Sequence, residues 1–196
     1  MAERGTYVVI EGIDGTGKTE LATRLVPPLL ARGHSVSSFR EPTDKFLHEQ
    51  FVRLAKIDSL SAALCFTVDR AMLRPEVERA LDQGDVVVQD RSFYSTLAYH
   101  SPGLSAEAFR ELERIQRILA IDPDLVLYLD APIDIAMKRV EGSGERGAFE
   151  DEPYLSRVKR KFEQMFQQPR WVRINATGNP NRTLEQAMNA LMSAGL

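Results

Sequence analysis

A phosphate-binding loop is the clearest chemical signal in this chain of 196 residues. Gly12 and Gly17 are separated by four residues, and Lys18 and Thr19 follow at the expected start of a helix. Glycines let backbone N–H groups curl around phosphate oxygens, and lysine reaches the β and γ phosphates. The threonine hydroxyl is expected to hold Mg²⁺. The pattern predicts that a nucleoside triphosphate binds along Gly12, Ile13, Asp14, Gly15, Thr16, Gly17, Lys18 and Thr19.

Three arginines outside this loop are candidates for binding a second phosphorylated molecule. Arg40 and Arg91 each follow a predicted buried strand, and Arg70 lies within an apolar helix. A phosphorylated acceptor needs cations because two polyanions must be brought together, and a planar guanidinium pairs bidentately with phosphate. Phe66 shares a helix face with Arg70, so the pair could stack on and hydrogen-bond a base. The same pair would equally suit a core phenylalanine beside a rim arginine.

The order of apolar runs predicts the elements that must position these residues. Short runs typical of strands buried on both faces alternate with longer helical patterns, which favours an α/β fold with a mostly parallel sheet. No linker divides the chain, so we expect a single domain with three layers. Strands are expected at 7–10, 36–39, 86–88, 124–129 and 171–174, and helices at 18–32, 45–56, 60–82, 105–120, from 133, up to 167 and near the C-terminus.

Polar residues follow the predicted strands at the edge where ligands bind in such sheets. Glu11 ends the first strand, Arg40 the second, Asp90 the third and Asp130 the fourth. We expect these residues to converge on one rim. Asp130 precedes Ala131-Pro132 and a predicted helix, so it is interpreted as an N-cap.

Three further local patterns give predictions that the structure can test. Pro27-Pro28 should kink the first helix or end it early, since proline lacks the amide donor. Thr183 and Gln186 have the spacing of a capping box for the last helix. The glycines of residues 142–147 match a dinucleotide-binding fingerprint, but they follow a charged helical segment instead of a strand, which excludes that interpretation.

Composition and charge limit the partners of the chain. The formal net charge is −3, which gives no global attraction for nucleic acid or an anionic membrane. No apolar run approaches the roughly 18 residues of a membrane span, and no signal-peptide core follows Met1. The cytoplasm is therefore the expected location. Cys65 is the only cysteine, which excludes an internal disulfide and a cysteine metal site.

Taken together, these segments resemble the thymidylate kinase family, which comprises P-loop nucleoside monophosphate kinases. The resemblance covers residues 5–165 in order and spacing, and the phosphate loop alone would not single out this family. It implies a three-layer P-loop fold with five parallel strands, transfer of the γ-phosphate of ATP to dTMP, Mg²⁺ as cofactor, and a homodimer. The matching segments are Val9–Thr19, Arg40-Glu41-Pro42, Phe66–Ala71, Asp90-Arg91-Ser92, Ser95–Tyr99 and Pro123–Asp130.

The resemblance implies how the base and sugar of dTMP would be held. Phe66 would stack on thymine, and Arg70 would hydrogen-bond its exocyclic oxygen. Thr96 would contact the edge of the base. Tyr99 would lie under the deoxyribose and disfavour a 2′-hydroxyl, and Asp14 would lie near the 3′-hydroxyl.

The resemblance also implies the residues around the transferred phosphate. Arg40 and Arg91 would grip the phosphate of dTMP, while Asp90 and Thr19 would position Mg²⁺ or its waters. Lys18, Arg91 and Asp14 are thus the catalytic candidates within the matched motifs. Charge spreads over the equatorial oxygens during transfer, so a further cation is expected.

That further cation must come from outside the phosphate loop of this chain. Some family members carry an arginine within the loop, where Gly15 and Thr16 stand here. Residues 142–150 lie where the family has its lid, and Arg146 is our candidate, followed by Arg139. A surface loop with an incidental arginine is the alternative interpretation. Closure of the lid would exclude water from the site.

The chain departs from the family pattern at two places. Thr43-Asp44-Lys45 follows Arg-Glu-Pro where many members have Gly-Gly-Thr, and His100 stands where glutamine is common. Both changes bear on base specificity. A lone histidine before a turn is more often structural or exposed than catalytic.

Three other functions remain alternatives at this point. A deoxynucleoside kinase would transfer phosphate to a hydroxyl and would favour a carboxylate base, for which Glu11 is the candidate; a kinase for another nucleoside monophosphate would differ in the base. A nucleotide-dependent switch would need a guanine motif such as Asn-Lys-x-Asp, which is absent from the sequence. The arginines at 40 and 91 favour the monophosphate acceptor.

Overall fold

The computed structural model describes residues 4–43, 50–51, 53–54, 57–143, 151–168 and 170–196. Five strands form one parallel sheet in the order β2-β3-β1-β4-β5. The strands are β1 (Tyr7–Glu11), β2 (Val36–Arg40), β3 (Val86–Asp90), β4 (Leu125–Asp130) and β5 (Trp171–Asn175). The helices described are α1 (Lys18–Ala31), α3 (Ser59–Asp82), α4 (Phe93–His100), α5 (Ala106–Leu119), α6 (Ile133–Ser143), α7 (Glu152–Met165) and α8 (Pro180–Ser193), with a 3-10 turn at Ser101–Gly103. The expected α/β fold is confirmed; most of the helix expected at 45–56 lies outside the described residues.

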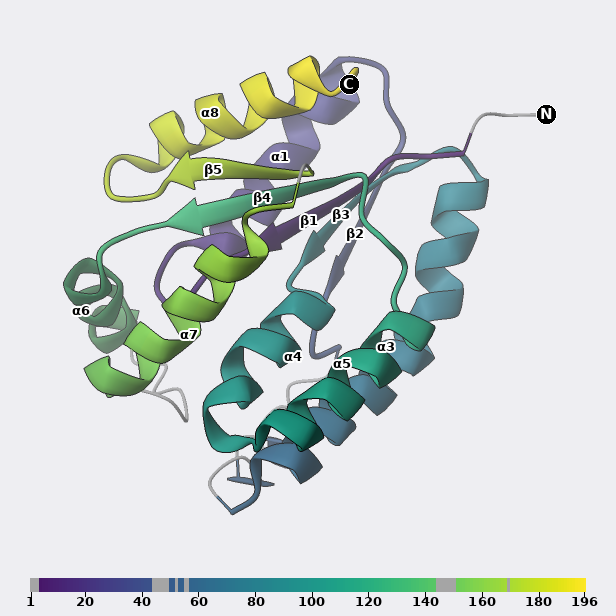
Figure 1. The fold of residues 1–196 in the computed structure, drawn as a ribbon. Coiled ribbons are helices and arrows are strands. Elements are labelled where there is room, and N and C mark those ends of the chain that lie inside the picture. The colour runs from purple at the N-terminus through teal and green to yellow at the C-terminus, as the bar shows by residue number, and fades with distance from the viewer. Residues whose placement is uncertain (1–3, 44–49, 52, 55–56, 144–150, 169) are drawn as a thin grey trace.

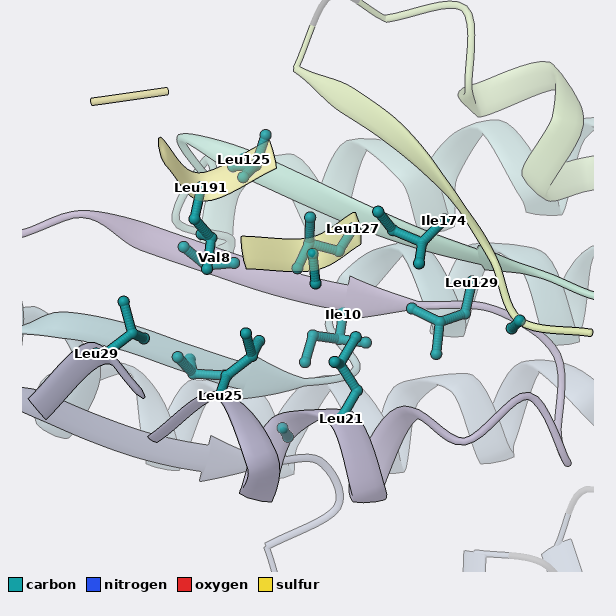
Figure 2. Packing of buried hydrophobic residues seen from close by; sticks show 14 of the residues in the cluster. Val8, Ile10, Leu21, Leu25, Leu29, Leu125, Leu127, Leu129, Ile174 and Leu191 are labelled. Carbon is teal, nitrogen blue, oxygen red and sulfur yellow. The ribbon is translucent and has the colours of Figure 1, made fainter. Parts of the chain in front are cut away.

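Helices cover both faces of the sheet and give three layers (Figure 1). On one face, α1 and α8 pack against alternate side chains of β1, β3 and β4, and Figure 2 shows Leu25, Leu29 and Leu191 meeting Val8 and Leu127 there. On the other face, α3 packs on the β1 and β3 side. Helices α4, α5 and α7 cover the β4 and β5 side of that face. Residues of β1 and β3 are buried throughout, as continuous apolar runs between two helical layers require.

The strand order places a topological switch point at the carboxyl ends of β1 and β3. This strand lies at the centre of the sheet between β3 and β4. The connections that leave β1 and β3 start at the same edge, because all strands run parallel. Such a switch point is where open α/β sheets bind ligands.

Among the described residues, no helix is both long and apolar enough to cross a membrane.

The bounds and caps of the helices test two local predictions. Helix α1 continues through Pro27 and Pro28 to Ala31, close to its expected range of 18–32, so the two prolines do not end it early. Leu25 and Leu29 are fully buried against the sheet, and this burial outweighs the lost amide donors. The proposed capping box of the last helix does not cap it. Asn179 is the N-cap and accepts a hydrogen bond from the amide of Asn181 at 2.8 Å, with proline at the first helical position.

Helix α4 is an element that the sequence patterns did not predict. All eight of its residues are buried, so it has no polar face and gives no amphipathic signal. Ser92 caps its start by accepting a hydrogen bond from the amide of Tyr94. The helix therefore carries Thr96, Tyr99 and His100 on a rigid, enclosed scaffold next to the end of β3.

Candidate active site

The loop from Gly12 to Gly17 joins the end of β1 to the start of α1. Thr16 closes it, since its amide and its hydroxyl both donate to the carbonyl oxygen of Ile13, at 3.4 and 2.8 Å. Gly15 has a φ of 79°, and a Cβ there would collide with the carbonyl oxygen of Ala136 in α6. This packing explains why the position holds no arginine. A side chain could enter only if α6 moved away from the loop.

Three charged side chains meet beside this loop. The ammonium of Lys18 donates to the carbonyl oxygen of Ile13 at 2.8 Å and lies 3.7 Å from Oδ1 of Asp14. The guanidinium of Arg91 forms an ion pair with the same carboxylate oxygen. Burial raises the pKa of Asp14, but the charges of Arg91 and Lys18 outweigh it and hold that pKa at about 2. Burial, followed by the charge of Arg91, lowers the pKa of Lys18 to about 8.

A carboxylate and a hydroxyl lie where a cation could bind next to these charges. The Thr19 hydroxyl donates to Oδ2 of Asp90 at 2.5 Å. Asp90 is 2% exposed, and its Oδ1 has no hydrogen-bond partner among the described residues. Buried polar atoms are normally paired, so an orphaned carboxylate oxygen indicates a missing ligand. The pair fits Mg²⁺, which uses one or two protein oxygens together with phosphates and waters.

Arg91 is held in an unusual backbone conformation at the end of β3. Its φ of 70° lies in the left-handed region, which costs a residue other than glycine on the order of 1 kcal/mol or more. Its guanidinium lies 5.4 Å from the centre of the Tyr99 ring. The Tyr99 hydroxyl in turn accepts a hydrogen bond from the amide of Asp14 at 2.8 Å. The structure thus brings Asp14, Arg91 and Tyr99 together.

Glu11 holds the turn that presents Arg91. Its Oε1 accepts hydrogen bonds from the amide and hydroxyl of Ser92 at 2.8 and 2.7 Å and from the amide of Ser95 at 3.3 Å. Its Oε2 accepts from the Ser95 hydroxyl at 2.6 Å. Burial raises the pKa of Glu11, although the hydrogen bonds from Ser95 and Ser92 lower it. With 0% exposure and both oxygens engaged, Glu11 is a structural clamp, which argues against its role as a general base.

Arg70 lies at the centre of a buried polar network instead of on an open helix face. Its Nε donates to Oε1 of Glu41 at 3.0 Å and its Nη2 pairs with Oε2, so the ion pair is bidentate. The same Nη2 donates to the hydroxyl of Thr96 at 2.9 Å, and Nη1 donates to Oε1 of Gln116. Gln116 also donates to the hydroxyl of Thr67 at 2.5 Å. These contacts use four of the five guanidinium donors and fix the group beside α4.

Phe66 lies next to this network, within a group of three rings. Phe51 meets it edge to face at 5.0 Å between centroids, and the His100 ring lies 5.6 Å away. His100 is 1% exposed, and burial lowers its pKa to about 4. The structural reading of His100 is therefore supported over an exposed or catalytic one. Phe66 is itself half-buried, so part of its surface remains accessible.

The remaining arginine candidates, Arg40, Arg139 and Arg146, differ in their exposure and in their contacts. Arg40 is exposed at the end of β2, in register with Asp90. Arg139 donates to the carbonyl oxygen of Ala176 at 2.7 Å and also reaches that of Gly15 at 3.5 Å. These contacts hold Arg139 against the outside of the loop, which disfavours it as the additional cation. Arg146 and most of the expected lid at 142–150 lie outside the described residues.

Two further sequence expectations are resolved at this edge. Thr43 donates through its hydroxyl to Oδ1 of Asp69 at 2.6 Å, so the altered segment after Pro42 is tied to α3 at this point. Asp130 is not an N-cap. It pairs with Lys159 at 2.7 Å and with Arg173 at 2.6 Å, because it ends β4 three residues before α6 begins and faces α7 and β5.

Sequence reasoning missed three residues that build the site. Glu41 belongs to the Arg-Glu-Pro motif, which predicts no role for it, although it forms the ion pair with Arg70. Gln116 has a signal that was not used, since it is a polar residue on the buried side of an amphipathic helix. Gln89 is a buried polar residue that follows three buried valines within β3 and precedes Asp90. A polar residue within a buried run must be satisfied by a partner, which is a readable signal.

Known proteins similar to this chain were found by two comparisons. The family model described as thymidylate kinase matches residues 10–187. A protein of Thermoplasma acidophilum named "Probable thymidylate kinase" is 32% identical over 164 residues, covering 80% of this chain and 82% of that protein. Proteins with the same name from Thermococcus gammatolerans and Methanothermobacter thermautotrophicus are 34% and 33% identical, covering 86% and 89% of this chain and 88% of each relative.

Proposed function

The chain belongs to the thymidylate kinase family and is a phosphotransferase that converts ATP and dTMP to ADP and dTDP, and we propose that Lys18, Asp14 and Arg91 form the centre of this reaction. The observation that carries the proposal is the ion pair between Arg91 and Asp14, with Lys18 3.7 Å from the same carboxylate. It joins the end of β3 to the loop after β1. An acceptor phosphate bound by Arg91 would therefore lie beside the donor phosphates.

In the proposed mechanism, positioning and charge neutralisation lower the barrier. Residues 12–19 bind the phosphates of ATP through backbone amides, and Lys18 pairs with the β and γ oxygens. Arg40 and Arg91 hold the phosphate of dTMP. The acceptor is already an anionic nucleophile, so no general base is needed, consistent with the engagement of Glu11. Thr19 and Asp90 would hold Mg²⁺, which would supply neutralisation of phosphate charge.

The base and sugar of dTMP are proposed to occupy the space between α3 and α4. Phe66 would stack on thymine, and Arg70 would offer its remaining donor to an exocyclic oxygen. The hydroxyl of Thr96 accepts a hydrogen bond from Nη2 of Arg70 at 2.9 Å, and Thr96 would contact the edge of the base. Tyr99 would contact the deoxyribose from the position where its hydroxyl holds the loop amide of Asp14. Residues 142–150 are proposed as the lid, with Arg146 as the additional cation.

A coupled assay of ADP formation with several acceptors tests this proposal. We expect dTMP to be phosphorylated faster than dCMP or AMP, and thymidine not to be a substrate. The Arg91→Met variant should lower kcat/KM for dTMP at least a hundredfold, since a charge-assisted contact to the acceptor phosphate is lost. Arg182→Met removes an exposed arginine from α8 and is the matched control. Turnover of thymidine equal to that of dTMP would instead indicate a deoxynucleoside kinase.

We propose that a second copy of this chain covers an apolar face on α3. Leu64, Val68 and Met72 follow one another at helical spacing and are 39%, 60% and 70% exposed, and Ile118 of the adjacent α5 is 66% exposed. Apolar side chains gathered in this way favour a protein interface. Val68→Glu should convert a dimer to a monomer in analytical ultracentrifugation. Met192→Glu makes the same change on α8 and should leave the dimer intact; a monomeric wild-type protein would refute the assignment.

A further inference from the structure

Gln89 is a buried polar residue near the carboxyl end of β3. It lies in β3 with 2% exposure, between Val9 of β1 and Phe39 of β2 in the strand register. Its side chain faces the layer that contains α3, as the contacts below require. Burying an amide is costly unless each of its polar atoms is paired. An apolar residue would fit this position without that cost, so the partners of Gln89 must compensate for the burial of its amide.

All polar atoms of the Gln89 amide have partners, and their chemistry fixes its orientation. Nε2 donates to Oε1 of Glu41 at 2.9 Å and to the carbonyl oxygen of Arg91 at 2.9 Å. Oε1 accepts from the hydroxyl of Tyr7 at 2.9 Å. A carboxylate and a carbonyl can only accept, so the NH₂ group must face them. The amide cannot flip without facing two acceptors with its own oxygen.

The two acceptors of this NH₂ group belong to the two halves of the proposed dTMP site. Glu41 is the bidentate partner of Arg70, the arginine proposed to contact the base. The carbonyl of Arg91 belongs to the residue proposed to hold the phosphate, and its backbone adopts a strained φ of 70°. No other side chain among the described residues hydrogen-bonds to both Glu41 and Arg91. Gln89 therefore joins both subsites through one rigid group.

We propose that Gln89 is a positioning residue that fixes the distance between the base-binding and the phosphate-binding arginines of the acceptor site. The inference rests on the proposed function, because it needs Arg70 and Arg91 to contact dTMP. Gln89 itself touches no substrate. Its loss leaves the Glu41–Arg70 pair and the strained turn at Arg91 free to shift separately. Both recognition of the base and alignment of the phosphate then weaken, while the ATP loop stays in place.

Three variants separate positioning from general stability. Gln89→Met keeps the length and shape of the side chain but removes its hydrogen-bonding groups. Tyr7→Phe is the matched control, because it removes one bond to the Gln89 amide on the side away from both arginines. Gln89→Met leaves the buried Tyr7 hydroxyl without its acceptor. The double variant Tyr7→Phe/Gln89→Met removes that hydroxyl as well, so it recovers part of the stability that Gln89→Met loses.

Steady-state kinetics and thermal unfolding of these variants provide the test. We expect Gln89→Met and the double variant to lower kcat/KM for dTMP roughly tenfold, as the loss of a hydrogen bond to a charged group implies, with KM for ATP unchanged. The preference for dTMP over dCMP should fall in both. Tyr7→Phe should keep wild-type kinetics despite a lower Tm.

Two results would overturn the inference, and a further variant distinguishes it from failure of the proposed function. Kinetics of Gln89→Met or of the double variant equal to those of Tyr7→Phe would leave Gln89 with a structural role only. An equal rise of KM for ATP and for dTMP would mean a general distortion of the site. The Arg91→Met variant serves as the reference. Unchanged turnover of dTMP in that variant refutes the proposed acceptor site. A large loss of dTMP turnover in Arg91→Met, combined with wild-type kinetics in Gln89→Met, refutes only the positioning role of Gln89.

Discussion

The buried histidine at the end of α4 makes stability depend on pH in a way that can be calculated. His100 is 1% exposed, and burial lowers the pKa of its imidazole from 6.5 to about 4. The folded protein thus keeps His100 neutral, while the unfolded chain takes up a proton as the pH falls below 6.5. The contribution of His100 to stability is fully present above that value and is lost as the pH falls toward 4.

The size of the effect follows from the two pKa values. Between pH 7 and pH 5 the unfolded state becomes almost fully protonated at this site and the folded state hardly at all. The resulting loss is roughly 2 kcal/mol for this residue alone. Such a loss is a large part of the stability of an ordinary domain. Removing the titratable ring should remove this part of the acid sensitivity and leave the part due to carboxylates.

Urea unfolding of wild type and His100→Gln across pH 5 to 8 measures the difference. The fluorescence of Trp171, the only tryptophan, reports on unfolding because its side chain is buried in β5. We expect the wild-type free energy of unfolding to fall by roughly 2 kcal/mol more than that of the variant between pH 7 and 5. Glutamine is a suitable replacement because it stays neutral over this range. Parallel curves for the two proteins would refute the reasoning.

Three further predictions concern the donor side of the site. Gly15→Ala should destabilise the protein by on the order of 2 kcal/mol and raise KM for ATP, since its Cβ meets a carbonyl of α6. Gly178→Ala is the control, because a Cβ there meets open space, and thermal unfolding and kinetics should both stay unchanged. Asp90→Asn keeps an acceptor for Thr19 but should raise the Mg²⁺ concentration needed for half-maximal rate, and an unchanged requirement would contradict the assignment. Because the pKa of Lys18 is about 8, ATP binding near pH 8 should take up a fraction of a proton, and calorimetry in buffers of different ionisation enthalpy should detect it.

The elements that could be predicted from sequence are those with a simple burial pattern. The predicted strands at 7–10, 86–88 and 124–129 are apolar on both faces apart from Asp124, and each is a central strand of the sheet. Helix α4 escaped prediction for the same physical reason, since a helix that is buried all round has no polar face to reveal its period. The continuation of helix α1 through Pro27-Pro28 shows the reverse case, in which tertiary packing overrides a local preference.

At the candidate site, residue types could be predicted better than their contacts. The approach of Arg91 to Asp14 follows from parallel strands that end at one edge, so it was predictable. The engagement of Glu11 by two serines was not, because it depends on how the turn after β3 folds back onto β1. The same holds for Arg70, whose partners come from three separate segments of the chain.

The pairing of β1 with β3 has a consequence for how the reacting groups are aligned. Ile10 and Asp90 are partners in the register, and the phosphate loop and Arg91 each begin within two residues of that pair. The relative position of the donor-binding loop and the acceptor-binding arginine along the strands is therefore set by the hydrogen-bonded register of β1 and β3, and not by loop motion. A one-residue slip would move Arg91 by about 3.3 Å and turn alternate side chains to the opposite face. One residue inserted between Val87 and Val88 should thus abolish transfer even in a chain that still folds and binds ATP.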